Sequence, residues 1–134
     1  MVQIKWSTIS EVNPKETYFA YGARAERKSA WSYFSYLMKA RKVQNQLNQT
    51  KGLLGFTAQL GFFDRQVIQL AVFENESALK EFANTGQHAQ CMKQTKSSLK
   101  SIKSTTWNIP GQDMPPKITD AIRRIENLKE EVKN

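Results

Sequence analysis

The sequence predicts an α+β domain in which an antiparallel sheet carries helices, and three observations lead to this prediction. Two stretches rich in apolar, β-branched and aromatic residues are joined by only two residues, as in an antiparallel hairpin. One helical pattern lies before this hairpin and another lies after it. A further strand precedes the first helix and another follows the second. The order is therefore strand, helix, strand, strand, helix, strand.

Four segments have the composition or the alternation of strands. They are residues 16–24, 53–63, 66–74 and 105–109. Asp64 and Arg65 form the tight connection of the hairpin. The first fourteen residues have mixed polarity and end in a proline, so we interpret them as a loosely held lead-in with room for one short strand.

The first two predicted helices have identifiable starts and stops. Ser29 is a suitable N-cap for a helix over 30–48, and Gly52 is a suitable left-handed stop after it. Asn75 can cap the second helix, which Gly86 interrupts. A second helical segment is expected from His88 to about residue 101. Within it four lysines recur at helical spacing and would form one cationic stripe, at positions 93, 96, 100 and 103.

A last helix is expected after the segment Asp113-Met-Pro-Pro, because proline suits the first helical turn. Its apolar residues recur at helical spacing and need a surface to pack on, either the sheet of the same chain or a partner subunit. They are Ile118, Ala121, Ile122, Ile125, Leu128 and Val132.

The complete order is the split βαβ, ferredoxin-like arrangement with a four-stranded antiparallel sheet. We expect a single domain over 1–134, with the ferredoxin-like core at 17–110 and a C-terminal helical extension at 111–134. Helices on one face of such a sheet leave the other face to be covered. A second copy is the natural cover, so a homodimer is predicted. The aromatic residues expected to need this cover are Tyr18, Phe19, Tyr21, Phe56, Phe73 and Trp107.

The formal net charge of +8 is concentrated on two predicted helices. Residues 24–51 include seven basic residues and one acidic residue, and residues 80–103 include five and one. Such a layer can attract an anionic partner, although a solvated lysine-rich surface looks the same in sequence. No nucleic-acid motif accompanies the charge, so nucleic acid is not an expected partner.

Several features predict a cytoplasmic protein. No apolar run approaches the ~20 residues of a membrane helix, and the N-terminus lacks the apolar core of a signal peptide. The single cysteine, Cys91, excludes an internal disulfide, which is consistent with a reducing compartment. One histidine and one cysteine do not make a zinc site, so no metal is expected.

Three short motifs occur in an order that resembles a known superfamily. They are Lys51-Gly-Leu-Leu-Gly-Phe, the strand–helix–histidine turn from Phe73 to His88, and Thr106-Trp-Asn-Ile-Pro-Gly followed by Met114-Pro-Pro. Over residues 17–116 the chain resembles the dimeric α+β barrel superfamily, in its antibiotic-biosynthesis monooxygenase-like branch. The Trp-x-Ile-Pro-Gly tail resembles that of several branches of this superfamily.

The resemblance implies a small, flat, largely apolar ligand bound between the sheet and the helix layer. Cofactor-independent monooxygenases of this type use the electron-rich ring of the substrate to activate oxygen, so no dedicated cofactor is expected. His88 would be the catalytic base or polar anchor, because imidazole titrates near neutrality. An aromatic pocket would bind the substrate by stacking. Its expected residues are Tyr21, Phe34, Phe56, Phe73 and Trp107.

Two alternatives stay open. Haem-degrading relatives use an asparagine on the first strand, a tryptophan at the end of the third and a histidine on the second helix. His88 matches the histidine, but Phe73 stands in place of the tryptophan and the first strand has no asparagine. Non-catalytic binding of haem or another small ligand through His88 therefore stays open. The other alternative is an interaction module that docks an anionic partner through its lysine-rich helix.

Overall fold

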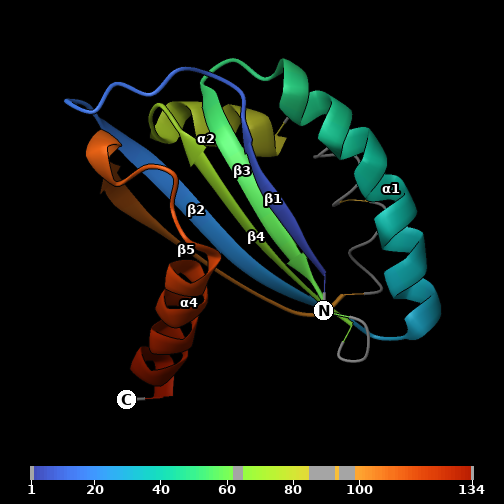
Figure 1. Ribbon diagram of the computed structural model, residues 1–134. Coiled ribbons are helices and arrows are strands. Elements are labelled where there is room, and N and C mark those ends of the chain that lie inside the picture. Colours follow the sequence, from blue (N-terminus) through green and yellow to red (C-terminus); the bar gives the residue numbers. More distant parts are fainter. Residues whose placement is uncertain (1, 62–64, 85–92, 94–98, 134) are drawn as a thin grey trace.

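The computed structural model describes residues 2–61, 65–84, 93 and 99–133 (Figure 1). Its strands and helices follow in this order: β1 (Val2–Thr8), β2 (Thr17–Arg27), α1 (Ala30–Gln49), β3 (Leu53–Leu60), β4 (Gln66–Phe73), α2 (Glu76–Asn84), β5 (Leu99–Pro110), the short 3-10 turn η2 (Gly111–Asp113) and α4 (Ile118–Lys133). Within the described part of the chain, no helix is both long and apolar enough to cross a membrane.

The predicted ferredoxin-like arrangement is confirmed, with one strand more than expected. The sheet has the order β1-β3-β4-β2-β5, and each described pair of neighbours is antiparallel. The extra strand is β1, which pairs with β3 at the edge of the sheet. The sequence alternates apolar residues at Val2, Ile4 and Trp6, but the lysine and glutamine between them give this segment its mixed polarity.

The predicted helix from His88 to residue 101 is wrong at its C-terminal end. Residues from Leu99 onward belong to β5, which pairs with almost the whole length of β2. Both lysines lie on this strand, Lys100 at an irregularity in its pairing with β2 and Lys103 opposite Arg24. Lys100 lies 3.7 Å from a carboxylate oxygen of Glu26. The predicted helical lysine stripe therefore does not form at these two positions, while residue 96 lies outside the described residues.

Two local predictions are confirmed. Gly52 has a φ of +83°, the left-handed conformation expected of the residue that stops α1. The Asn75 side-chain oxygen accepts a hydrogen bond from the Ala78 N–H at 2.9 Å, as expected of an N-cap. Both depend on residues close together in the chain.

The two faces of the sheet are covered by different helices, with α1 and α2 on one side and α4 on the other (Figure 1). On the α1/α2 side, the core cluster consists of Leu53, Phe56, Phe73 and Phe82. On the α4 side, Ile118 and Ala121 pack on Ile68 and Leu70. A second cluster beside them on that side consists of Tyr18, Ala20, Leu54, Val72 and Ile109.

The apolar helix α4 packs in cis, on the sheet of its own chain. The six aromatic residues predicted to share one uncovered face are in fact divided between the two faces. Two of them, Tyr18 and Trp107, lie on the α4 side. The other four lie on the α1/α2 side, and they are Phe19, Tyr21, Phe56 and Phe73. Because α4 already covers its side, the argument from an uncovered face no longer supports a dimer. The homodimer stays a prediction.

Candidate functional site

Alanines lie among larger side chains in the middle of the sheet on the α1/α2 side. Strand pairing places Phe56, Ala71, Tyr21 and Thr106 in one row across the sheet, and Ala58, Gln69, Ala23 and Ser104 in the next. Paired residues of neighbouring strands point to the same face. Ala25 follows on this face. The four alanines are called the alanine strip here, and three of them, Ala25, Ala58 and Ala71, are only half-buried although helices lie over this face.

One end of the alanine strip is closed by aromatic residues. Phe73 is 1% exposed, and its ring centroid lies 5.9 Å from that of Phe82 on α2. Phe56 is buried in the same cluster, and Ala71 packs against it. The apolar end therefore offers edges and faces of aromatic rings next to small side chains.

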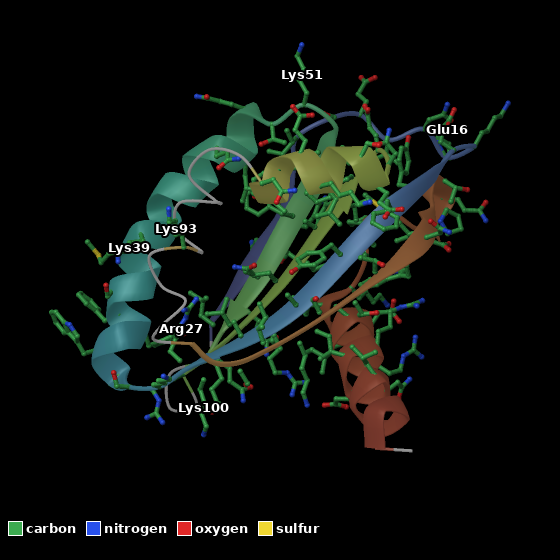
Figure 2. All side chains as sticks on the ribbon, turned by 180° about the vertical axis from the view of Figure 1, so that it is seen from behind. Glu16, Arg27, Lys39, Lys51, Lys93 and Lys100 are labelled. Carbon is green, nitrogen blue, oxygen red and sulfur yellow. The ribbon has the colours of Figure 1, made fainter. Side chains whose placement is uncertain are left out.

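The other end of the alanine strip carries a buried cation. Arg27 follows Tyr21, Ala23 and Ala25 on the same face of β2, and it is 2% exposed (Figure 2). The strip thus runs from an aromatic end to a guanidinium.

Tyr21 is the polar group at the middle of this face. Its hydroxyl shares a hydrogen bond with Ser104 of β5. Burial raises the pKa of Tyr21 above its usual 10.0, and the hydrogen bond to Ser104 offsets only part of that rise. The phenol is therefore protonated at neutral pH and can donate a hydrogen bond to a ligand oxygen.

The raised pKa of Tyr21 predicts a stability loss in alkali. A group whose folded pKa lies above its unfolded pKa contributes stability that is complete below the unfolded value. That contribution is lost as the pH rises from about 10 through the folded pKa. The native protein should show late-ionising tyrosine absorbance in a titration at alkaline pH, and Tyr21→Phe should lower the amplitude of that phase by one tyrosine. A Tyr21→Phe titration with an unchanged late amplitude would contradict the assignment.

The structure brings together three of the five predicted pocket residues, Tyr21, Phe56 and Phe73. Phe34 is 56% exposed on α1, and its ring stacks with that of Trp31, with 6.1 Å between the centroids. Trp107 lies on the opposite, α4 side of the sheet, where it packs against both core clusters. The predicted catalytic residue His88 and its neighbour Cys91 lie outside the described residues.

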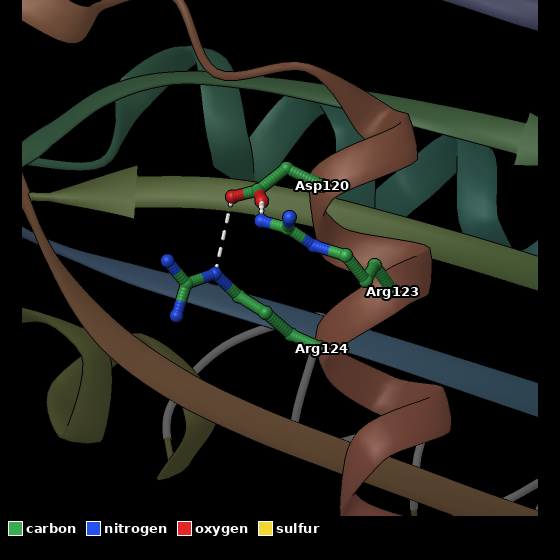
Figure 3. A network of polar contacts seen from close by, with 3 residues as sticks. All are labelled: Asp120, Arg123 and Arg124. Carbon is green, nitrogen blue, oxygen red and sulfur yellow. Dashed lines mark hydrogen bonds and ion pairs between the residues drawn. The ribbon is translucent and has the colours of Figure 1, made fainter.

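Trp107 is held by Arg124 of α4, and Figure 3 shows the polar network on α4 that contains Arg124. The Arg124 guanidinium lies 4.7 Å from the centroid of the Trp107 ring, at cation–π distance. Asp120 accepts a hydrogen bond from the Arg124 Nε at 3.1 Å and another from Arg123. Burial alone would raise the pKa of Asp120, but the hydrogen bonds from Arg124 and Arg123 outweigh it and lower that pKa. This network orients Arg124 on the ring and contributes to helix packing.

Comparison with known proteins identifies the family. Residues 24–133 match the family described as "Domain of unknown function (DUF3291)". The chain belongs to this family. No curated protein sequence matches it.

Solved structures share the fold at low sequence identity. One is a putative monooxygenase from Lactobacillus acidophilus, with a TM-score of 0.63 and 13% identity over 78% of this chain and 47% of that one. A second, from Nitrosomonas europaea, is a putative antibiotic biosynthesis monooxygenase, with a TM-score of 0.60 and 9% identity. The match covers 66% of this chain and 95% of that one. A third, an antibiotic biosynthesis monooxygenase, has a TM-score of 0.58 and 11% identity. The match covers 68% of this chain and 95% of that one.

These similarities confirm the monooxygenase-like fold that the motifs resemble. The chain spans about half the length of the Lactobacillus acidophilus protein. Among the described residues, no three potential metal ligands form a group. Phe73 is buried beside Phe82 and β2 contains no asparagine, so the residues present do not fit haem degradation of the kind set out above.

Sequence reasoning missed the alanine strip and Ser104. Alanine has no chemistry of its own to attract notice, and its importance here is the space that it leaves. The alternation of Ala23 and Ala25 along β2 was a visible signal. Only the strand register shows that Ala58 and Ala71 extend the same surface.

Proposed function

We propose that the protein binds a small, flat, largely apolar molecule along the alanine strip and oxidises it without a dedicated cofactor. The half-burial of Ala25, Ala58 and Ala71 carries this proposal, because the face is sheltered by helices yet its smallest side chains stay accessible. A flat molecule could stack near Phe56 while its oxygen meets the Tyr21 hydroxyl.

The proposed reaction needs only the substrate and molecular oxygen. An electron-rich ring with an acidic CH2 group loses a proton and gives electrons to O2. One oxygen atom forms a C=O group at that carbon, and the other leaves as water with both hydrogens of the CH2 group. Tyr21 would donate a hydrogen bond to the oxygen on the ring, where negative charge develops. His88 would be the base that takes the proton.

The experiment is a titration with a dihydroxyanthrone, followed by fluorescence for binding and by oxygen uptake for turnover. Ala58→Leu should fill the strip and weaken affinity at least about tenfold, which corresponds to ~1.4 kcal/mol. Gln59→Leu is the matched control, since it adds an apolar side chain at the next residue on the other face of the same strand. Its affinity should stay close to that of the wild type.

Activity variants separate binding from chemistry. Tyr21→Phe keeps the ring but removes the hydrogen bond to the ligand oxygen, so it should weaken affinity by less than about tenfold while it lowers turnover. His88→Ala should lower turnover by about 10²–10⁴-fold if the histidine is the base. Equal weakening by Ala58→Leu and Gln59→Leu, or the absence of oxygen uptake above the buffer rate, would reject the proposal. A haem titration of wild type and His88→Ala decides the alternative of haem binding.

A further inference from the structure

Helix α1 exposes a row of large apolar side chains. Trp31 is 77% exposed, Phe34 is 56% exposed and Met38 is 50% exposed. Spacings of three and four residues place them on one side of the helix. Four large apolar side chains are exposed in the described part of the chain, and three of them are in this row. The name α1 ridge is used here for Trp31, Phe34 and Met38.

The α1 ridge is not needed to attach α1 to the sheet. Tyr33, which is 8% exposed, and Leu47, which packs on the core cluster of Phe56 and Phe73, lie on the sheet side. Side chains this exposed bury only part of their apolar surface in the folded chain. A contiguous group of them marks a surface that binds something else.

The charge around the α1 ridge indicates what that partner is. Lys28 and Lys51 are exposed just before and just after α1, and Lys39 lies on the helix between them. Figure 2 labels Lys39 and Lys51. The helix sequence also contains Arg41 and Lys42, and it has no acidic residue. A second copy docked through the same face would bring together two helices that contain basic residues and no acidic ones, and like charges repel one another. The partner is therefore expected to be anionic.

Membrane surfaces fit this combination of features. Apolar and aromatic side chains of an amphipathic helix enter the boundary between headgroups and acyl chains, while lysines stay at the level of the phosphates. Tryptophan prefers that boundary in particular. We propose that α1 docks the protein on an anionic lipid surface, with the α1 ridge inserted and Lys28, Lys39 and Lys51 on the phosphates. This proposal does not depend on the proposed oxidation.

The test is co-sedimentation with vesicles of phosphatidylcholine mixed with phosphatidylglycerol, compared with vesicles of phosphatidylcholine alone. The full chain should sediment with the mixed vesicles at low salt, and added salt should release it, because headgroup charges are screened. Trp31→Ser with Phe34→Ser should weaken this binding by at least about tenfold, since both rings lose their apolar burial.

Charge variants test the role of the lysines. Lys28→Gln with Lys39→Gln should weaken binding to the mixed vesicles by about fivefold per lysine, as expected of basic residues near an anionic surface. Lys15→Gln with Lys117→Gln removes the same charge from two exposed positions outside α1, in the loop before β2 and just before α4. This control should bind as the wild type does.

Tryptophan fluorescence locates the contact. Trp6 and Trp107 are half-buried and remain in Trp31→Phe, so this variant should still sediment with mixed vesicles but lose most of the blue shift seen in the wild type. Lys39 is half-buried and the other replaced side chains are exposed, so every variant should keep the thermal unfolding midpoint of the wild type within a few degrees.

Three results would overturn the proposal. The first is equal binding to both kinds of vesicle or to neither. The second is equal loss of binding in the Lys28/Lys39 and Lys15/Lys117 variants. The third is a lipid-free dimer that the Trp31/Phe34 variant converts into a monomer in sedimentation equilibrium, because the α1 ridge would then be occupied by a second copy of the chain.

Discussion

Replacing Phe73 with alanine is expected to lower the free energy of unfolding by about 3–5 kcal/mol. The ring is 1% exposed and contacts Phe82 of α2, so its removal leaves a cavity between the sheet and that helix. Residue 73 is the last of β4, a strand that pairs with both β2 and β3. Urea unfolding followed by circular dichroism measures the loss as a lower midpoint with an unchanged slope.

Phe34→Ala is the matched control, because it removes the same ring from an exposed site on α1. Its cost should stay within about 0.5 kcal/mol, the usual range for surface substitutions. Equal costs at the two positions would show that Phe73 is not part of the core. The comparison also guides ligand studies, because an affinity loss in Phe73→Ala can come from unfolding, whereas Ala58→Leu tests the strip at a half-buried position.

Local signals in the sequence predicted the elements that depend on neighbouring residues. Gly52 stops α1 through its own backbone conformation, and Asn75 caps α2 through a contact three residues away. The hairpin of β3 and β4 needs a connection of only a few residues. Each of these features is decided by physical interactions that the sequence displays directly.

Long-range pairing decided the features that the sequence did not predict. The lysines from 93 to 103 have helical spacing, but β2 extends to Arg27 and pairs with residues from Leu99 onward. Backbone hydrogen bonds along that pairing favour a strand over a short polar helix. The prediction that the aromatic residues share one face of the sheet was wrong for the same reason. Strand register and the docking of α4 decide on which side Trp107 lies.

The residues of the candidate site also divide into those that the sequence predicted and those that only the folded sheet reveals. Tyr21, Phe56 and Phe73 were chosen as aromatic residues, and the strand register puts all three on one face. Trp107 was chosen by the same criterion and lies on the other face. An aromatic residue on a strand satisfies a core and a pocket equally well. What distinguishes the two is the size of its neighbours, and those neighbours are brought together only in the folded sheet.

Gly111→Ala is expected to lower the free energy of unfolding by about 2–3 kcal/mol. A Cβ atom at this position would lie 2.1 Å from the Asn13 carbonyl oxygen and 3.0 Å from the Cα of Pro14, so the backbone itself would have to move. Forced repacking of this kind costs about 1–3 kcal/mol or more. Alanine offsets less than about 1 kcal/mol of that by restricting the unfolded chain.

The loop that Gly111 approaches has little freedom to retreat. The Asn13 carbonyl accepts the Glu16 N–H at 3.1 Å, the Asn13 N–H donates to the Tyr18 hydroxyl at 2.8 Å, and the Gly111 N–H donates to the Glu16 carbonyl at 2.8 Å. A shift large enough for a methyl group would strain all three hydrogen bonds. Gly22→Ala is the matched comparison, because its Cβ would meet the Trp107 ring at 3.2 Å and no backbone atom so closely. The midpoint of thermal unfolding of Gly111→Ala should be well below that of Gly22→Ala, and the reverse order would contradict this account.

The Trp-x-Ile-Pro-Gly tail then has a structural reason. Trp107 packs on α4, Ile109 enters the core, and Gly111 lets the loop before β2 close over the end of β5.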